Sequence, residues 1–182
     1  ILFVALVAVY AVALYAQAGL LVVGVVVGSM MGGMIGWWNT TSRLPADPAR
    51  ILPLMLLMLG FFYIHVGEET VTGFHQAIAA LTGGTWPEHD FLLIIALAGP
   101  AIWFFASWSL WQRQAFGNFV LWFLVVGMIL GEPAHVLVFP VVFAIQHGGG
   151  YAYFSGMYTA LFAMVPAILI LVELLRTRQR AA

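Results

Sequence analysis

The sequence contains no cysteine and very few charged residues. Of its 182 residues, only 7% are Asp, Glu, Lys or Arg. The absence of cysteine excludes disulfides, thiolate catalysis and cysteine-held metal clusters. Soluble domains carry about 25% charged residues, so the low charge excludes an ordinary soluble enzyme. The formal net charge of −1 favours no nucleic-acid partner.

Most of the sequence consists of long apolar runs. The chain is 64% hydrophobic, and its mean hydropathy is +1.05. Apolar runs of about 20 residues are typical of helices that span a membrane. Only helices or closed barrels satisfy their backbone groups in lipid, and the unbroken runs favour helices over alternating strands. We therefore expect an all-α, polytopic transmembrane helical bundle that forms a single domain over residues 1–182, with membrane lipids as its surroundings.

The apolar runs predict about six helices. One helix over the first 38 residues would be roughly 57 Å long, well beyond a bilayer core of about 30 Å. We therefore divide this run near Gln17-Ala18-Gly19, with a single long tilted helix as the alternative. The fifth helix contains Pro133 and Pro140, which predict kinks. The expected helices are about 1–16, 20–38, 51–80, 91–111, 118–146 and 153–175.

The loops alternate in charge, which predicts the orientation of the bundle. The loops at 81–90 and 147–152 contain no Lys or Arg. Under the positive-inside rule the loops with basic residues are cytoplasmic. With six helices, both termini are then expected in the cytoplasm. The basic residues are Arg43, Arg50, Arg113, Arg176, Arg178 and Arg180.

Three carboxylates lie inside these apolar segments. Glu68 and Glu69 belong to the stretch His65-Val66-Gly67-Glu68-Glu69, and Glu132 to Glu132-Pro133-Ala134-His135. A carboxylate at mid-membrane costs about 2.5–3.5 kcal/mol even on lenient insertion scales. No Lys or Arg lies between positions 50 and 113, or between 113 and 176. The carboxylates therefore need a metal, a proton or a cationic substrate group.

Helix geometry predicts that these groups meet. His65 lies 14 residues after Ile51, and Glu132 lies 14 residues after Asn118, so both are expected roughly 21 Å along parallel helices. Residues three and four apart share a helix face, and such pairs on facing helices build metal sites in bundles. His147 could fold back over the site on the glycines at 148–150. The candidate metal ligands are His65, Glu68, Glu69, Glu132, His135 and His147.

Imidazole and carboxylate ligands suit zinc or iron, as one ion or two. Two histidines and a glutamate around zinc would leave a position for water. Glu69 could act as a base on that water, and Tyr153 could supply a proton. This pattern predicts a membrane-embedded metal-dependent enzyme, either a hydrolase or an oxidoreductase, that acts on an apolar or lipid-like substrate.

Other readings of the same residues stay open. The carboxylates could be protonated and simply share hydrogen bonds with the histidines. His65 and His135 could be axial ligands of a b-type haem, in an electron-transfer or accessory subunit of a larger membrane complex. Glutamate and histidine could also form the relay of a proton-coupled transporter.

Helix 20–38 carries a stripe of small residues. Such a stripe allows a second helix to approach closely. The partner is either another helix of this chain, or a second copy or larger complex. The stripe consists of Gly24, Gly28, Gly32 and Gly36.

The ordered polar motifs resemble those of a family of small bacterial membrane proteins named for its HXXEE motif. His65-x-x-Glu68-Glu69 has this signature, Gly117-Asn118 resembles the family's Gly-Asn pair, and His135 resembles its later histidine. Tyr153-Phe154-Ser155-Gly156 resembles its Tyr-x-Pro-Gly motif, with serine in place of proline. The resemblance covers the third to sixth expected helices. It implies a polar site in a bacterial inner membrane, and no particular reaction.

Overall fold

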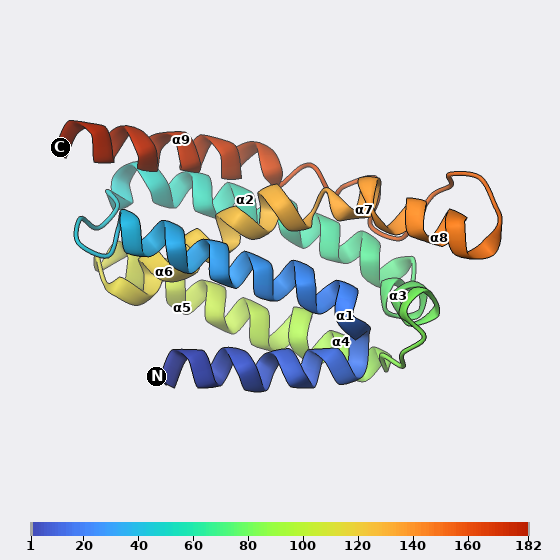
Figure 1. The fold of residues 1–182 in the computed structure, drawn as a ribbon. Helices are drawn as coiled ribbons and strands as arrows, with labels where there is room; N and C mark the ends of the chain where they lie inside the picture. The colour runs from blue at the N-terminus through green and yellow to red at the C-terminus, as the bar shows by residue number, and fades with distance from the viewer. Residues whose placement is uncertain (1, 182) are drawn as a thin grey trace.

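The chain folds as a bundle of helices that lie side by side (Figure 1). The computed structural model describes the backbone of residues 2–181, and the side chains in that range except those of 2–6, 10, 13, 17, 18 and 177–181. No strand occurs in this range, so the predicted all-α class is confirmed. The helices are α1 (Leu2–Asn39), α2 (Pro48–Val71), α3 (Phe74–Thr82), α4 (Glu88–Leu92), α5 (Gly99–Trp111), α6 (Ala115–Val126), α7 (Ala134–Leu137), α8 (Phe139–His147) and α9 (Met164–Ala181), with π-helical segments η1 (Leu93–Ala98) and η2 (Gly127–Gly131).

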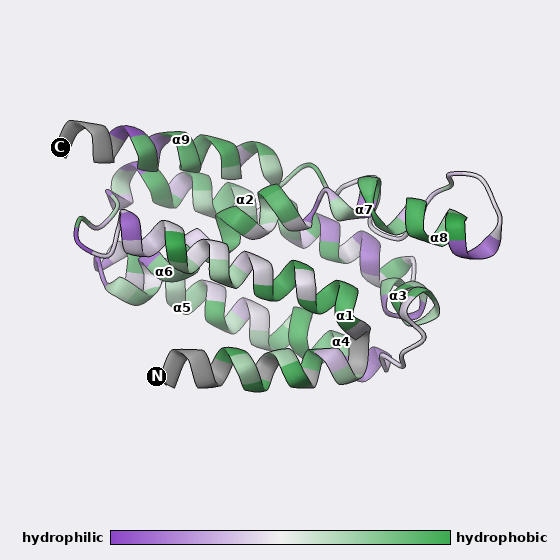
Figure 2. Cartoon of the chain, in the orientation of Figure 1, coloured by the Kyte–Doolittle hydropathy of each residue, from purple (hydrophilic) through white to green (hydrophobic). Residues whose placement is uncertain are grey.

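Four helices of the described chain are long and apolar enough to cross a membrane, and the hydrophobic residues along them are green in Figure 2. The protein is therefore an integral membrane protein. The expected count of six is corrected to four, because the segment Val7–Ala16 is short and α9 carries four charged residues, Glu173, Arg176, Arg178 and Arg180. The spans are Gly19–Asn39, Pro48–Val71, Glu88–Trp111 and Ala115–His147.

The first 39 residues contain the expected chain reversal. Gly19 has φ 77° and ψ 175°, outside the helical region, and α1 turns back on itself there (Figure 1). A Cβ atom at Gly19 would lie 2.8 Å from Cβ of Thr82. Both the positive φ and the close approach favour glycine at this position.

Half of the glycine stripe packs within the chain. A Cβ atom on Gly36 would lie 2.3 Å from the Trp122 ring of α6, and one on Gly32 would lie 3.0 Å from Val126. By contrast, a Cβ atom on Gly24 or Gly28 would meet nothing within 4 Å. The half of the stripe with Gly32 and Gly36 therefore packs against α6, and the half with Gly24 and Gly28 faces open space.

The helix expected over 51–80 is broken after Val71. Gly73 has φ 72°, and α3 starts again at Phe74. At the other end, Asp47 caps α2 by accepting a hydrogen bond from the amide of Ala49 (3.3 Å), and Pro48 occupies the first turn. Both features are typical of a helix N-terminus.

The helix expected over 118–146 is divided into α6, η2, α7 and α8. Pro133 has no N–H to donate and ends the π-helical stretch, as the predicted kink requires. A second break lies at Val138, two residues before Pro140. Between these breaks the chain turns so that Glu132 and His135 both face α2.

The last helix begins later than expected. Residues 153–163 form turns, and α9 starts at Met164 instead of Tyr153. The chain from His147 thus returns along α2 in a non-helical conformation before α9 begins. Irregular backbone at membrane depth is tolerated where protein groups satisfy its polar atoms, and the candidate site contains those groups.

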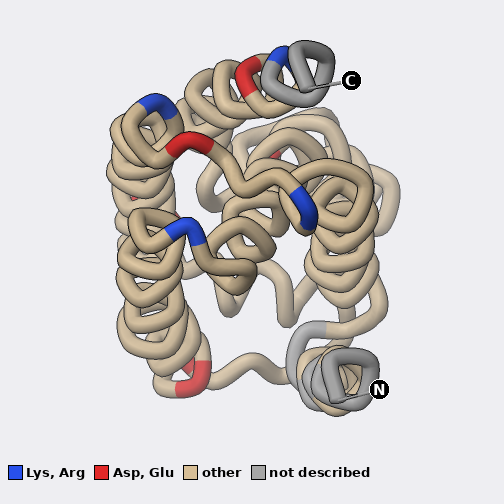
Figure 3. The backbone as a smooth tube through the Cα atoms, turned by 90° about the vertical axis from the view of Figure 1, so that its left-hand side faces the viewer, with Lys and Arg blue, Asp and Glu red and all other residues tan. Residues whose placement is uncertain are grey.

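Asp47, Glu173 and the described arginines gather at one end of the bundle (Figure 3), whereas Glu88 and Asp90 belong to α4 at the other end (Figure 1). Asp47 lies 3.6 Å from Arg50 and 3.5 Å from Arg113, and Arg50 lies 2.8 Å from Glu173. Both ends of the described chain lie at this same end of the bundle (Figure 1). The side chains of Arg178 and Arg180 lie outside the described residues.

Candidate metal centre

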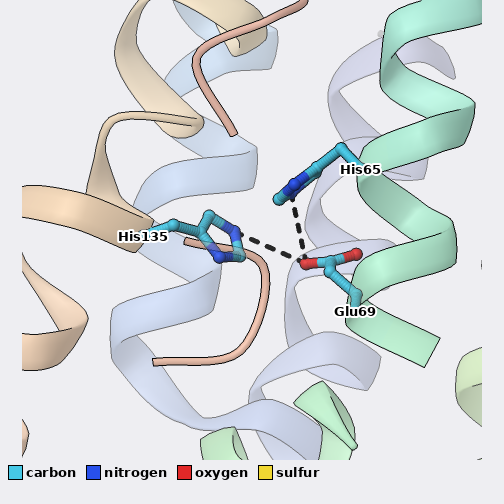
Figure 4. A group of neighbouring side chains, drawn as sticks. All are labelled: His65, Glu69 and His135. Carbon is cyan, nitrogen blue, oxygen red and sulfur yellow. Dashed lines mark ion pairs between the residues drawn. The ribbon is translucent and has the colours of Figure 1, made fainter. Parts of the chain in front are cut away.

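Two histidines and one glutamate converge between α2 and α7 (Figure 4). Nε2 of His65 lies 3.6 Å from Oε1 of Glu69, and Nε2 of His135 lies 3.4 Å from the same oxygen. The candidate ligand atoms all lie within 4.8 Å of one another. The exposed fractions of the three residues are only 1%, 6% and 6%. These three residues could hold a metal ion.

The orientation of His135 follows from its other ring nitrogen. Nδ1 of His135 lies 2.9 Å from the carbonyl oxygen of Ser155. A carbonyl oxygen can only accept a hydrogen bond, so Nδ1 carries the proton that it donates. In a neutral imidazole, Nε2 then presents its lone pair towards Glu69. Metal-ligating histidines are commonly held by such a contact.

His65 is oriented by a chain of two hydrogen bonds. The hydroxyl of Thr159 donates to Oε2 of Glu68 over 2.5 Å. Its single hydrogen is therefore used, and its oxygen accepts from Nδ1 of His65, 3.3 Å away. A neutral His65 then also presents the lone pair of Nε2 to the centre. With both rings neutral and Glu69 ionised, both imidazoles present acceptor atoms to its carboxylate, and a cation between them would satisfy all three groups.

Glu132 completes the polar centre. Its Oε2 lies 2.8 Å from Nε2 of His65, which confirms the equal depth predicted for the two residues. The π-helical segment η2 comes directly before Glu132, and the amide of Glu132 bonds to the carbonyl of Gly127 five residues back. Such π-bulges frequently occur at functional sites. Oε2 is buried without a well-directed hydrogen bond, so a proton or a cation must offset its contact with the His65 lone pair.

Glu68 lies beside the centre and has a different set of partners. Oε1 accepts from the hydroxyl of Tyr153 (2.7 Å) and the amide of Tyr158 (3.1 Å). Oε2 accepts from the hydroxyl and the amide (2.9 Å) of Thr159. Glu68 therefore satisfies backbone donors of the non-helical stretch 153–163, which explains how that stretch is tolerated at the depth of α2. We leave Glu68 out of the proposed ligand set.

Gly156 covers the two imidazoles. Its φ is +84°, and an added Cβ atom would lie 2.6 Å from Nδ1 of His135 and 2.8 Å from Cε1 of His65. Only glycine allows the chain to pass this close in this conformation. The motif Tyr153-Phe154-Ser155-Gly156 contained the signal for this contact, but sequence spacing alone gave no reason to assign it to the histidines.

Three other histidines and Tyr153 lie away from the centre. His147 is exposed at the end of α8, where its ring stacks on Phe143 at 4.1 Å. His75 is buried against Phe91, and His89 is exposed. Tyr153 donates to Glu68 and stacks on Tyr158 at 4.6 Å. Burial raises the pKa of the Tyr153 phenol above its ordinary value, as does Glu68, so this hydroxyl stays protonated as a donor.

The Gly117-Asn118 pair noted in the sequence is distant from the centre and has a packing role. Oδ1 of Asn118 accepts from the amide of Ala46 (2.9 Å), and the residue is fully buried. A Cβ atom on Gly117 would lie 2.2 Å from the amide nitrogen of Leu110. This pair therefore joins α6 to α5 and to the loop that follows α1.

A cavity of about 210 Å³ opens beside the metal centre. Its polar lining residues include Glu69, Glu132, His135 and Ser29. All four candidate spans contribute to its otherwise apolar walls, which include Val26, Phe62, Trp103 and Phe123. The cavity therefore lies inside the bundle at membrane depth, in contact with the group that could hold a metal.

Comparisons with models of protein families, with curated proteins and with solved structures found no match to this chain.

Proposed function

We propose that the protein is a membrane-embedded metal-dependent enzyme that acts on an apolar or lipid-like substrate. The observation that carries this proposal is the convergence of Nε2 of His65 and Nε2 of His135 on Oε1 of Glu69, at 3.6 and 3.4 Å. Their Nδ1 atoms are engaged by Thr159 and Ser155. Two lone pairs and a carboxylate in an apolar interior are stabilised by a cation.

The donor set suits zinc or iron. Two imidazoles and one carboxylate leave a coordination position open for water in catalytic zinc sites, and iron is also compatible with these ligands. Glu132 is placed to act as a fourth ligand or as a base next to that open position. One ion needs only His65, Glu69 and His135, whereas two ions would also need Glu132.

A b-type haem fits these residues less well. The two imidazole centroids are only 4.6 Å apart, with interplanar angle 89°. A porphyrin would have to lie between the two Nε2 atoms, where Oε1 of Glu69 lies within 3.6 Å of both. A second interpretation of the same geometry is a proton shared by His65 and Glu132. Such a shared proton is the basis of a relay in a proton-coupled transporter.

We also propose the orientation of the protein in the membrane, its location and the surroundings of its glycine stripe. We assign the arginine-rich end of the bundle to the cytoplasm, under the positive-inside rule. The resemblance to the HXXEE-motif family supports a bacterial inner membrane. The open half of the glycine stripe, at Gly24 and Gly28, is available to lipid or to a second copy.

Elemental analysis of the purified protein tests the metal. We expect zinc or iron at one or two ions per chain, and substantial loss in Glu69→Gln and His135→Ala. Glu88→Gln, at an exposed position, is the matched control. Equal metal in all four proteins would contradict the proposed ligands, and no metal in any of them would favour the shared proton.

Comparison of membrane lipids before and after incubation tests the enzyme. Mass spectrometry should detect a product with the wild-type chain, and much less with Glu132→Gln if this residue is the base. A lipid profile that is identical with and without the wild-type protein would contradict an activity on these lipids.

A further inference from the structure

We propose that the cavity beside the metal centre binds the hydrocarbon chain of a neutral, single-chain lipid whose terminal oxygen function, an alcohol or an aldehyde, faces Glu69, Glu132 and His135. This inference deepens the proposed function and rests on it for the role of the polar end.

The apolar walls of the cavity favour a ligand with a hydrocarbon chain. They include Phe62, Phe74, Trp103 and Phe123, and the ionisable groups among them are Glu69, Glu132 and His135. A largely apolar pocket with a few convergent polar groups is the usual form of a ligand site. Because every candidate span contributes to the lining, the natural source of the occupant is the bilayer.

The charges around the cavity favour a ligand whose polar end is neutral. No arginine lines the cavity, and Arg50 and Arg113 pair with acidic residues at the far end of the bundle. A phosphate head group would lack the basic partners that normally bind it. A fatty carboxylate would meet the carboxylates of Glu69 and Glu132. An alcohol or aldehyde oxygen avoids this repulsion and can approach a bound metal ion.

The size of the cavity selects one chain. Its volume of about 210 Å³ is below the roughly 300–1,000 Å³ of sites for drug-sized ligands. A lipid with two acyl chains and a glycerol head group is too bulky for this space. One slender chain is compatible with it.

A second hollow borders the cavity on the outer side of the bundle. This groove has a volume of about 780 Å³ and shares Val25 and Ser29 with the cavity wall. Its lining includes Leu20 and Leu130, which are largely exposed, and Gly24. The open half of the glycine stripe thus lies in the groove. We assign the groove as the path along which the tail of the lipid extends towards the bilayer.

Photolabelling of the purified protein in nanodiscs tests this assignment. The probe is a dodecanol with a diazirine on its chain, and the comparison probes are the carboxylic acid and the trimethylammonium compound of the same length. We expect the alcohol to label cavity residues, in competition with unlabelled dodecanol. Val26→Phe fills the cavity and should reduce this labelling about tenfold, as expected for overpacking. Val12→Phe, at a position that is largely exposed, should leave it unchanged.

Metal content, measured on the same samples, separates the two proposals. Cavity labelling by the alcohol without bound metal would overturn the metal centre and leave the lipid site. Bound metal with labelling restricted to the outer surface would overturn the lipid site alone. Equal cavity labelling by the acid or the ammonium probe, or crosslinks from the groove to a second copy, would also overturn it. The labelled positions in the wild-type chain decide the matter even if Val26→Phe fails to fold.

Discussion

The hydroxyl of Thr159 lies between Glu68 and His65, 2.5 Å from the Oε2 of the first and 3.3 Å from the Nδ1 of the second. It donates to the carboxylate and accepts from the imidazole. Glu68 is therefore linked to the metal centre through Thr159 without contacting it as a ligand. This relationship explains how one glutamate of the adjacent pair holds the chain in place while the other faces the candidate metal.

Thr159→Val removes the hydroxyl with little change in volume. His65 then loses the acceptor that fixes its tautomer, and metal affinity should fall by about 10- to 100-fold, the usual range for such supporting contacts. Competition with a chelator measures this affinity. Thr159→Ser keeps the hydroxyl and should retain most of the affinity, and equal affinities in all three proteins would contradict the proposed role.

Gly156→Ala introduces a methyl group against both imidazoles. The clash with Nδ1 of His135 (2.6 Å) and the positive φ of Gly156 should displace the rings. We expect loss of most of the bound metal in elemental analysis. Gly149→Ala, whose added Cβ atom meets nothing within 4 Å, is the control. Full metal content in Gly156→Ala would show that the chain does not pass over the histidines as described.

Glu68→Ala removes the acceptor for the amides of Tyr158 and Thr159. In a bilayer, backbone donors left without a partner cost free energy. We therefore expect faster hydrogen exchange of the amides in residues 153–163 and a lower melting temperature. Glu88→Ala, at an exposed position, should change neither. Unchanged exchange in Glu68→Ala would contradict its role in holding this stretch.

Gly117→Ala should destabilise the protein without affecting the metal centre directly. The added Cβ atom would lie 2.2 Å from the amide nitrogen of Leu110, so α5 and α6 would have to separate. Thermal unfolding should show a clear loss of stability, whereas the metal affinity of the folded fraction should stay near that of the wild type. Gly60→Ala, with open space around the added atom, should be tolerated.

The sequence allowed prediction of the features that depend on helix periodicity. His65 and Glu69 are four residues apart and share a face of α2, and equal depth brought Glu132 to His65. The same rule did not separate Glu68 from Glu69. Adjacent helical residues differ by about 100° around the axis, so these two side chains turn to different neighbours, and only the tertiary structure determines which one faces the histidines.

The late start of α9 shows a second limit. Residues 153–163 contain enough apolar side chains to resemble the start of a helix, yet their amides at Tyr158 and Thr159 bond to Glu68, which lies 90 and 91 residues earlier in the chain. Local propensity carries no information about such a distant partner. The close pass of Gly156 over the imidazoles depends on the same return of the chain, so it could not be derived from spacing either.

X-ray absorption spectroscopy of the metal-loaded protein tests the central claim most directly. The account predicts metal–nitrogen distances of about 2.0–2.1 Å, a scattering pattern from two imidazoles in the wild-type chain, and one imidazole fewer in His135→Ala. A wild-type spectrum without imidazole scattering, or one that His135→Ala leaves unchanged, would contradict a metal ion held by His65, Glu69 and His135.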